Sequence, residues 1–232
     1  MTSPLASTPL FHIGPVPITE SVLATWAIML VLVVGGMIAT RRLALVPGRI
    51  QAALELIVDA VDSQIRDTMQ VEPAAYRGFI GTLFVFIFIS NWSSLVPGVE
   101  PPTAHIETDA ALALLVFLAV IWFGVRAGGV RGYLATFATP SPLMIPLNFV
   151  ESVTRTFSLL VRLFGNVMSG VFVIGIVLSL AGLLVPIPLM ALDLLTGAVQ
   201  AYIFAVLAMV FIAGALGEEK PAPVSSSQRT PS

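Results

Sequence analysis

Long apolar runs, separated by short polar segments, dominate the chain. Residues 22–39, 79–96 and 110–125 are apolar over almost their full length. Each run approaches the ~20 residues that a helix needs to cross a hydrocarbon layer ~30 Å thick. The pattern therefore predicts three membrane-spanning helices, of which the second and third form a two-span hairpin.

Residues 49–69 follow a different pattern, because their apolar positions recur at helical spacing. The apolar side is Ile50, Leu54, Ile57, Val61, Ile65 and Met69, and the opposite side carries Gln51, Glu55, Asp59, Asp62 and Arg66. This periodicity is typical of an amphipathic helix. The alternative, a helix packed on a soluble body, finds little such body in this chain. We therefore expect an interfacial helix on the cytoplasmic membrane surface.

The last two apolar segments, residues 143–184 and 187–216, are longer than one perpendicular crossing needs. About thirty helical residues extend ~45 Å at ~1.5 Å per residue, so such helices must tilt, kink or lie partly along the bilayer. Gly182, Pro186 and Pro188 predict a turn between them, which makes the pair a helical hairpin. Residues 218–232 are rich in Pro, Ser and charge and predict a disordered cytoplasmic tail.

Composition supports a membrane protein. Of the 232 residues, 57% are hydrophobic and only 10% are charged, whereas an ordinary globular domain carries about 25% charged residues. So few charges cannot cover a water-exposed surface, and residues 1–217 are predicted to form a single membrane domain. The chain has no cysteine, and His12 and His105 lie far apart in sequence. We therefore expect no disulfide, no metal site and no cofactor.

The arginines predict the orientation of the chain. Arg41, Arg42 and Arg49 follow the first apolar run, and Arg126 and Arg131 follow the third, whereas the loop between the second and third runs is acidic and has no Lys or Arg. Under the positive-inside rule, the amino terminus and the acidic loop lie outside, and the arginine-bearing segments and the carboxyl terminus are cytoplasmic. The start of the chain lacks the positive charge of a signal peptide, so the first run is expected to remain as a span.

Polar side chains in the two long segments gather on single faces. At ~100° per residue, seven of those in the first segment fall within an arc of about 80°. They are Asn148, Glu151, Arg155, Ser158, Arg162, Asn166 and Ser169. In the second segment Asp193, Thr196, Gly197 and Gln200 share a face in the same way.

An arginine at bilayer depth is kept only against a partner or a water-filled cavity. Arg155 has a structural explanation, because Glu151 lies one helical turn earlier and can pair with it. Arg162 has no acidic residue within four positions, which favours a functional role. Its permanent positive charge would block cations along an aqueous path, and would hold a carboxylate brought past by another subunit in its ionised form.

Asp193 and Gln200 each allow two interpretations. Asp193 lies close to Pro188 and is either a helix cap or a protonatable group in an ion path. A lone intramembrane glutamine such as Gln200 often only joins helices. A hairpin that turns near Gly182 would bring Asp193 level with Val171, and Gln200 close to the level of Arg162.

These residues resemble a known family. Ser158-Leu-Leu-Val-Arg162-Leu-Phe-Gly-Asn166, followed by Gly170, looks like the signature of subunit a of F-type ATP synthases. Gln200-Ala-Tyr-Ile-Phe204 resembles the matching motif of the last helix in that family. Val46-Pro-Gly-Arg-Ile-Gln51 with Glu55, and Asn91 in the second apolar run, are similar too, so the resemblance extends over about residues 40–217.

The resemblance implies an all-α integral membrane protein, with one span, an interfacial amphipathic helix, a two-span hairpin and a final pair of long tilted helices. It also implies an ion-translocating stator subunit in the membrane sector of a rotary ATP synthase. Arg162 would face the ring of c subunits and separate two half-channels. The residues expected along the ion path are Asn166, Gln200, Asp193, Ser169 and Ser158, supported by Asn148, Glu151 and Arg155.

The partners implied are the c-subunit ring, the peripheral-stalk b subunits and, indirectly, the soluble ATPase head, in the inner (plasma) membrane of a bacterium. The chain alone would catalyse nothing, because it has no phosphate-cradling glycine-rich loop. The translocated ion is expected to be H⁺, with Na⁺ as the alternative.

The sequence departs from the family pattern at three positions. Some bacterial relatives have a glutamate where this chain has Val171, and a histidine where it has Asp193; a proline often stands in place of Thr156. We therefore expect the outer half-channel to be built differently or to serve another ion, as in a divergent sodium-type variant.

The sequence has two alternative interpretations of its function. A secondary ion transporter would predict paired interrupted helices from a repeated half, and the chain contains no second copy of the charged hairpin. A purely structural membrane anchor would leave Arg162, Asp193 and Gln200 without a purpose.

Overall fold

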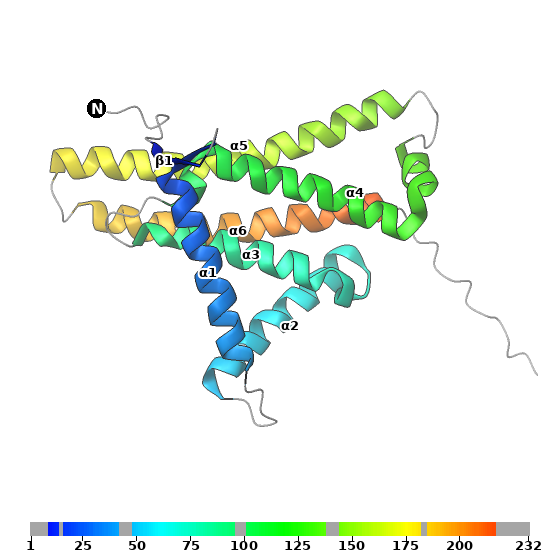
Figure 1. Cartoon of the computed structure of the whole chain (residues 1–232), viewed down its shortest axis with the longest axis horizontal. Coiled ribbons are helices and arrows are strands. Elements are labelled where there is room, and N and C mark those ends of the chain that lie inside the picture. The colour runs from blue at the N-terminus through cyan, green and yellow to red at the C-terminus, as the bar shows by residue number, and fades with distance from the viewer. Residues whose placement is uncertain are drawn as a thin grey trace, which may run out of the picture.

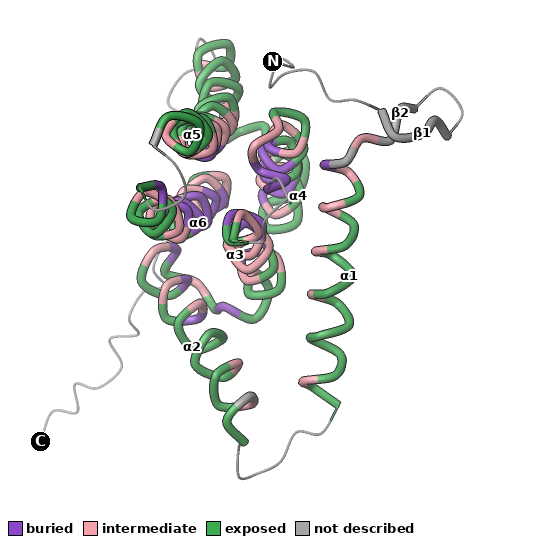
Figure 2. The backbone as a smooth tube through the Cα atoms, turned by 90° about the vertical axis from the view of Figure 1, so that its left-hand side faces the viewer, coloured by how far each residue is buried: buried purple, intermediate pink, exposed green. Residues whose placement is uncertain are grey.

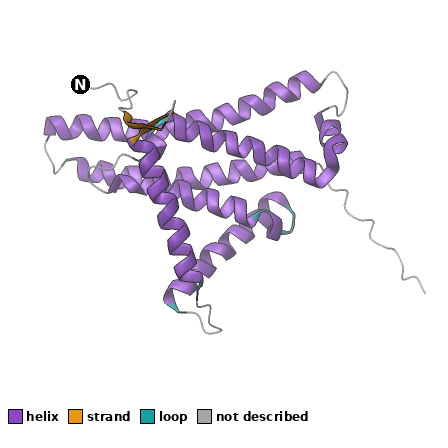
Figure 3. Cartoon of the chain, in the orientation of Figure 1, coloured by secondary structure: helices purple, strands orange, loops and turns teal. Residues whose placement is uncertain are grey.

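The computed structural model describes residues 9–13, 16–41, 48–95, 101–137, 144–181 and 185–216. The expected tail, residues 218–232, lies outside this part of the chain. The described residues form an all-α membrane protein preceded by a short strand pair (Figures 1 and 3). Its helices are α1 (Glu20–Thr40), α2 (Arg49–Met69), α3 (Arg77–Trp92), α4 (Ile106–Phe137), α5 (Ile145–Ala181) and α6 (Pro186–Leu216), with 3₁₀ turns η1 (Pro73–Ala75), η2 (Ser93–Leu95) and η3 (Pro102–Ala104).

A two-stranded antiparallel hairpin precedes α1. Strand β1 (Pro9–Ile13) pairs with β2 (Val16–Thr19). The sequence analysis did not predict it, because prolines such as Pro9 and Pro17 remove backbone donors and argue against strands.

In the described part of the chain, five helices are long and apolar enough to cross a membrane, namely Ser21–Thr40, Arg77–Leu95, Ile106–Ala135, Ile145–Leu180 and Pro186–Leu216. The third is much longer than the predicted span of residues 110–125. Arg126 and Arg131, which were expected to follow that span, are exposed residues inside α4. The helical backbone continues past Arg126 only as far as Gly129, whose φ of 69° is not helical and is a conformation that glycine adopts without strain. α4 therefore consists of two helical pieces that meet at a kink, and Arg131 lies in the second.

The four helices α3, α4, α5 and α6 form a bundle, which Figure 2 shows nearly end-on. α1 stands apart from this bundle and lies across its axis (Figures 1 and 2). Most of its side chains are exposed, for example Leu30 at 66% and Met37 at 64%, and only Ser21 near its start is buried among the residues described, as expected for a helix that faces lipid over most of its surface. α1 and the bundle therefore cannot both be perpendicular to one membrane. The 37 residues of α5 extend ~55 Å, which fits a strongly tilted helix.

The carboxyl-terminal half of α2 packs against α3 and α6. Ile65 and Met69 are buried in the common apolar core, and the Tyr202 hydroxyl donates to Gln64 Oε1 at 3.0 Å. Asp62 was placed on the polar side of this helix, and that placement is wrong. It is buried and forms an ion pair with Arg77 of α3, because a neighbouring guanidinium offsets the cost of burying a carboxylate.

Candidate functional site

One side of α5 carries the polar side chains that the sequence singles out. This polar face consists of Asn148, Glu151, Arg155, Ser158, Arg162, Asn166 and Ser169; Asn148 and Asn166 are half-buried and the other five are exposed. Leu159, Leu163 and Val167, which lie beside the polar face on the same helix, are buried in the core. The polar face therefore borders the core along one edge and is exposed along the rest.

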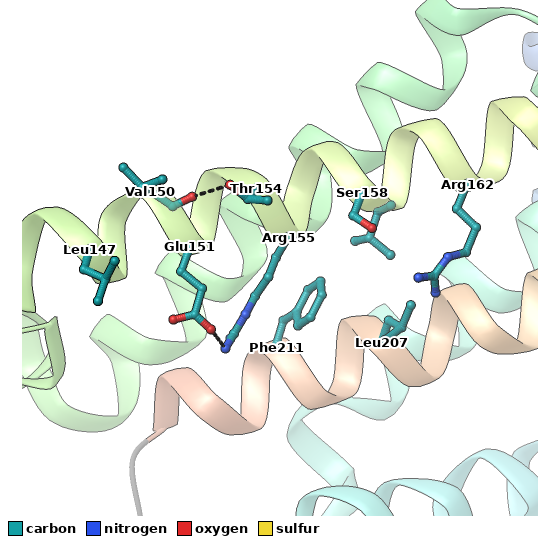
Figure 4. Close-up of a pocket in the computed structure, with 10 residues that line it drawn as sticks. Leu147, Val150, Glu151, Thr154, Arg155, Ser158, Arg162, Leu207 and Phe211 are labelled. Atoms are coloured by element: carbon teal, nitrogen blue, oxygen red, sulfur yellow. Dashed lines mark hydrogen bonds and ion pairs between the residues drawn. The ribbon is translucent and has the colours of Figure 1, made fainter.

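A groove runs between the polar face of α5 and α6 and has a volume of about 560 Å³. Arg155 and Arg162 line it from α5, and Leu207 and Phe211 line it from α6 (Figure 4). The groove thus combines two positive charges with an apolar wall.

Arg155 has partners within the chain. Its guanidinium forms an ion pair with Glu151, and its Cζ lies 5.5 Å from the centre of the Phe211 ring. That distance is within the ≈ 6 Å range of a cation–π interaction. The structural explanation of Arg155 therefore agrees with the geometry.

Arg162 differs from Arg155 although it lies only two turns away. Its side chain extends toward α6 beside Leu207 (Figure 4). Within the described residues it makes no hydrogen bond and no ion pair. Its charge is therefore free to interact with a group from outside the chain.

Asp193 and Val171 line one pocket of about 210 Å³, together with Leu194 of α6 and Ile174 of α5. Counting residues outward from the expected turn near Gly182 predicts that Asp193 and Val171 are neighbours. A Cβ atom at Gly170 would overlap the Asp193 carboxylate, so the glycine makes room for this half-buried acid.

Gln200 and Arg162, which the residue count from the turn predicts to meet, lie in different surroundings. Gln200 is 7% exposed and belongs to the buried side of α6, whereas Arg162 is exposed in the groove. In the described part of the chain no hydrogen bond joins the two side chains. The count fixes the level of two residues along a hairpin, but it does not fix the direction in which their side chains point.

Asn91 holds α3 against α6 and the loop before α4. Its Nδ2 donates to the Gly197 carbonyl at 2.8 Å, and its Oδ1 accepts from the Thr103 hydroxyl at 2.7 Å. A Cβ at Gly197 would lie 3.0 Å from the Asn91 Cβ, so the glycine permits this close approach. Nearby, Trp92 Nε1 donates to the Leu194 carbonyl at 3.1 Å. These polar groups are paired within the chain.

Comparison with known proteins shows the family to which a chain with this arrangement belongs. The family model described as ATP synthase A chain matches residues 22–213. A protein of Bradyrhizobium sp. strain BTAi1 named ATP synthase subunit a 2 is 57% identical over 93% of this chain and 97% of its own length. ATP synthase subunit a of Albidiferax ferrireducens is 44% identical over 90% and 92%, and ATP synthase subunit a 2 of Acaryochloris marina is 48% identical over 87% of both chains. This chain belongs to the ATP synthase subunit a family.

Membership of the subunit a family confirms the resemblance drawn from the arginine and glutamine motifs. The chain is a stator component of the membrane sector, a multi-pass membrane protein that works in a complex with other subunits of that sector. The motif residues themselves are Arg162 on an exposed face and Gln200 in the interior, so subunit a presents only part of its signature to a partner.

Two buried polar residues of this subunit a were missed as site candidates. Asp109 was assigned to the acidic loop outside, but it lies in the first turns of α4 and is fully buried. Ser90 of α3 is fully buried as well. The sequence carries a signal for Asp109, because it precedes Ala113 and Val116 on the apolar face of the same helix at one- and two-turn spacing.

Proposed function

We propose that this subunit a conducts ions along two offset half-channels that are separated by the charge of Arg162. The observation that supports it is the exposed Arg162 guanidinium in the groove beside α6, which has no hydrogen bond or ion pair to any other described residue. A buried or fully paired arginine would not offer its charge to a passing carboxylate.

The partner that the polar face of α5 suits is a ring of c subunits, each with one ion-binding carboxylate. An ion that enters one half-channel neutralises a ring carboxylate, which can then face lipid. After nearly a full turn of the ring, the carboxylate meets Arg162, becomes ionised and releases its ion into the other half-channel. Ser158, Asn166 and Ser169 would line this path on α5, and Asp193 and Gln200 would line it on α6.

The remaining assignments complete the proposal. The peripheral-stalk b subunits hold the chain against rotation and connect it indirectly to the soluble ATPase head, in the inner membrane of a bacterium. The ion is H⁺, and Na⁺ is the alternative that the transport assay decides. The amino terminus lies outside and the carboxyl terminus is cytoplasmic, following the arginines of the loops.

Replacement of Arg162 in the assembled complex tests the proposal. We expect Arg162→Ala to abolish ATP-driven transport in reconstituted vesicles, because no other charge takes its place, while the variant still co-purifies with the ring and the ATPase head. Addition or removal of Na⁺ in the wild-type assay identifies the ion. Transport by Arg162→Ala at more than half the wild-type rate would contradict the role of this charge.

The proposed orientation has its own test, because the chain contains no cysteine. Glu107 and Arg131 are exposed residues near opposite ends of α4, so Glu107→Cys and Arg131→Cys form a matched pair. A membrane-impermeant thiol reagent added outside should label only the first, and added from the cytoplasmic side only the second. The reverse pattern would invert the topology.

A further inference from the structure

Three side chains in the interior of the bundle carry polar atoms without a partner. Among the described residues, the buried side-chain N and O atoms that lack a hydrogen bond are Ser90 Oγ, both carboxylate oxygens of Asp109 and Gln200 Nε2. Ser90 and Asp109 are fully buried and Gln200 is 7% exposed. They come from α3, α4 and α6, and we refer to them as the buried polar cluster.

The register of α4 against α6 brings Asp109 and Gln200 to one level. A Cβ at Gly124 of α4 would lie 3.2 Å from the Ala215 carbonyl oxygen of α6. The two helices run in the same direction (Figure 1). Moving back by the same number of residues along both helices leads from Gly124 and Ala215 to Asp109 and Gln200. Both side chains lie on the buried sides of their helices, so they face the shared interior.

The register of α3 against α4 adds Ser90 to the same level. The rings of Tyr76 and Phe123 stack with their centres 4.9 Å apart, and the two helices run in opposite directions. Equal steps from this pair, forward along α3 and back along α4, lead to Ser90 and Asp109. The hydrogen bond from Asn91 to Gly197 independently places Ser90 within one turn of Gln200.

A buried carboxylate with no hydrogen bond cannot remain as an isolated anion in an apolar interior. The free-energy cost of removing the charge from water is large, and buried charges are therefore paired, neutralised or bound to cations. Neither a basic side chain nor a backbone donor reaches Asp109 in the described residues. Its charge must be balanced by a bound proton or cation.

We propose that the buried polar cluster is a binding station for the transported monovalent cation, with Asp109 as the group that holds it. One carboxylate oxygen takes up the proton, or the carboxylate together with the hydroxyl oxygen of Ser90 ligates Na⁺. The station releases the same cation that it binds, so charge balances. The assignment rests on the proposed function and adds a carboxylate on α4 to an ion path otherwise built from α5 and α6.

A purely structural alternative is that Asp109 stabilises α4 through the helix dipole, since acidic side chains are favourable near a helix amino terminus. Glu107 lies in the same turn and is exposed. It shares the dipole effect but not the burial, and Glu107→Gln is therefore the matched control for Asp109→Asn.

The test measures ATP-driven transport by the whole complex in vesicles. Asp109→Asn should lower the rate at least tenfold, whereas Glu107→Gln should keep more than half of it. Transport by Asp109→Asn at more than half the wild-type rate overturns the proposal. If Arg162→Ala stops transport and Asp109→Asn does not, only the binding station is wrong; if Arg162→Ala transports normally, the proposed function itself fails.

A second measurement needs no variant that has to fold. Dicyclohexylcarbodiimide is apolar and couples to protonated carboxyl groups, whose oxygen adds to its central carbon while the proton moves to its nitrogen. Mass spectrometry of wild-type complex should find Asp109 modified and Glu107 unmodified. Modification that Na⁺ slows identifies sodium as the bound cation, and modification indifferent to Na⁺ identifies the proton. An unmodified Asp109 overturns the proposal even if Asp109→Asn fails to assemble.

Discussion

The polar face of α5 and the contact of α6 with α3 around Asn91 differ in how their polar groups are satisfied. On α6 the carbonyls of Leu194 and Gly197 accept hydrogen bonds from side chains of α3. On α5 the side chains are mostly exposed, and Arg162 has no partner among the described residues. Buried polar groups that find partners in their own chain hold helices together. A charge without such a partner is available to another subunit.

The strongest way to break this comparison is to exchange the two arginines of the α5 face for lysine. Arg162→Lys should lose nearly all transport, because lysine lacks the planar guanidinium and can lose its proton when desolvated. Arg155→Lys should keep more than half, since an ammonium can still pair with Glu151 at one-turn spacing. ATP-driven transport in vesicles measures both, with the amount of assembled complex as the control. Equal losses in the two variants would show that pairing within the chain does not separate their roles.

The pocket at Asp193 and Val171 sharpens the comparison, because there the polar side of α6 reaches α5. Asp193→Asn should lower transport severely if this carboxylate carries ions in the half-channel beside the hairpin turn. Adding Val171→Glu should restore part of the rate, because it returns a carboxylate to the same pocket. Normal transport by Asp193→Asn would reduce Asp193 to a capping or packing residue.

Much of the fold follows from the sequence because the membrane imposes it. A span must satisfy its backbone internally and must be apolar, so hydropathy finds the spanning helices. Two features escaped this reasoning. Hydropathy stops at Arg126, although the first piece of α4 continues to Gly129 and a second piece follows the kink to Phe137. The ion pair that buries Asp62 depends on Arg77 of another helix, and helical periodicity within one segment cannot reveal it.

The candidate site was predicted in part for a similar reason. Helical spacing gathers the polar face of α5, and counting from the turn places Asp193 beside Val171. Neither argument gives the rotation of α6, so the burial of Gln200 was not foreseen, and its closeness to Arg162 stays a prediction. Asp109 was assigned to a loop because it follows other acidic residues in sequence. Its burial depends on the neighbouring helices that pack over α4, which the pattern of one segment does not contain.

Removal of the Asn91 side chain takes away the hydrogen bonds that join α3 to α6, so it should lower stability more than it changes ion transport. Asn91→Ala leaves the buried Thr103 hydroxyl without its acceptor, at about 1–3 kcal/mol, and removes the hydrogen bond from Asn91 Nδ2 to the Gly197 carbonyl. We expect a lower thermal denaturation midpoint of the purified complex. Ser93→Ala is the control, because its hydroxyl bonds only to the Ser90 carbonyl within the same turn. Equal midpoints for the two variants would rule out a bracing role for Asn91.

The smallest expected effect concerns the ion pair between Asp62 of α2 and Arg77, the first residue of α3, which is satisfied within the chain like the contact around Asn91. The hydrogen bond from Arg77 lowers the pKa of the Asp62 carboxyl, against the opposing effect of burial. Because the folded-state pKa is below the unfolded one, the pair stabilises the docking of α2 at neutral pH, and this contribution is lost as the pH falls below about 4. Hydrogen exchange of α2, corrected for its intrinsic pH dependence, should be faster in Asp62→Asn than in wild type at neutral pH. The difference should vanish on acidification. Asp67→Asn changes an exposed residue of the same helix and should match wild type throughout. If Asp67→Asn behaved like Asp62→Asn, the effect would come from net charge and not from the ion pair.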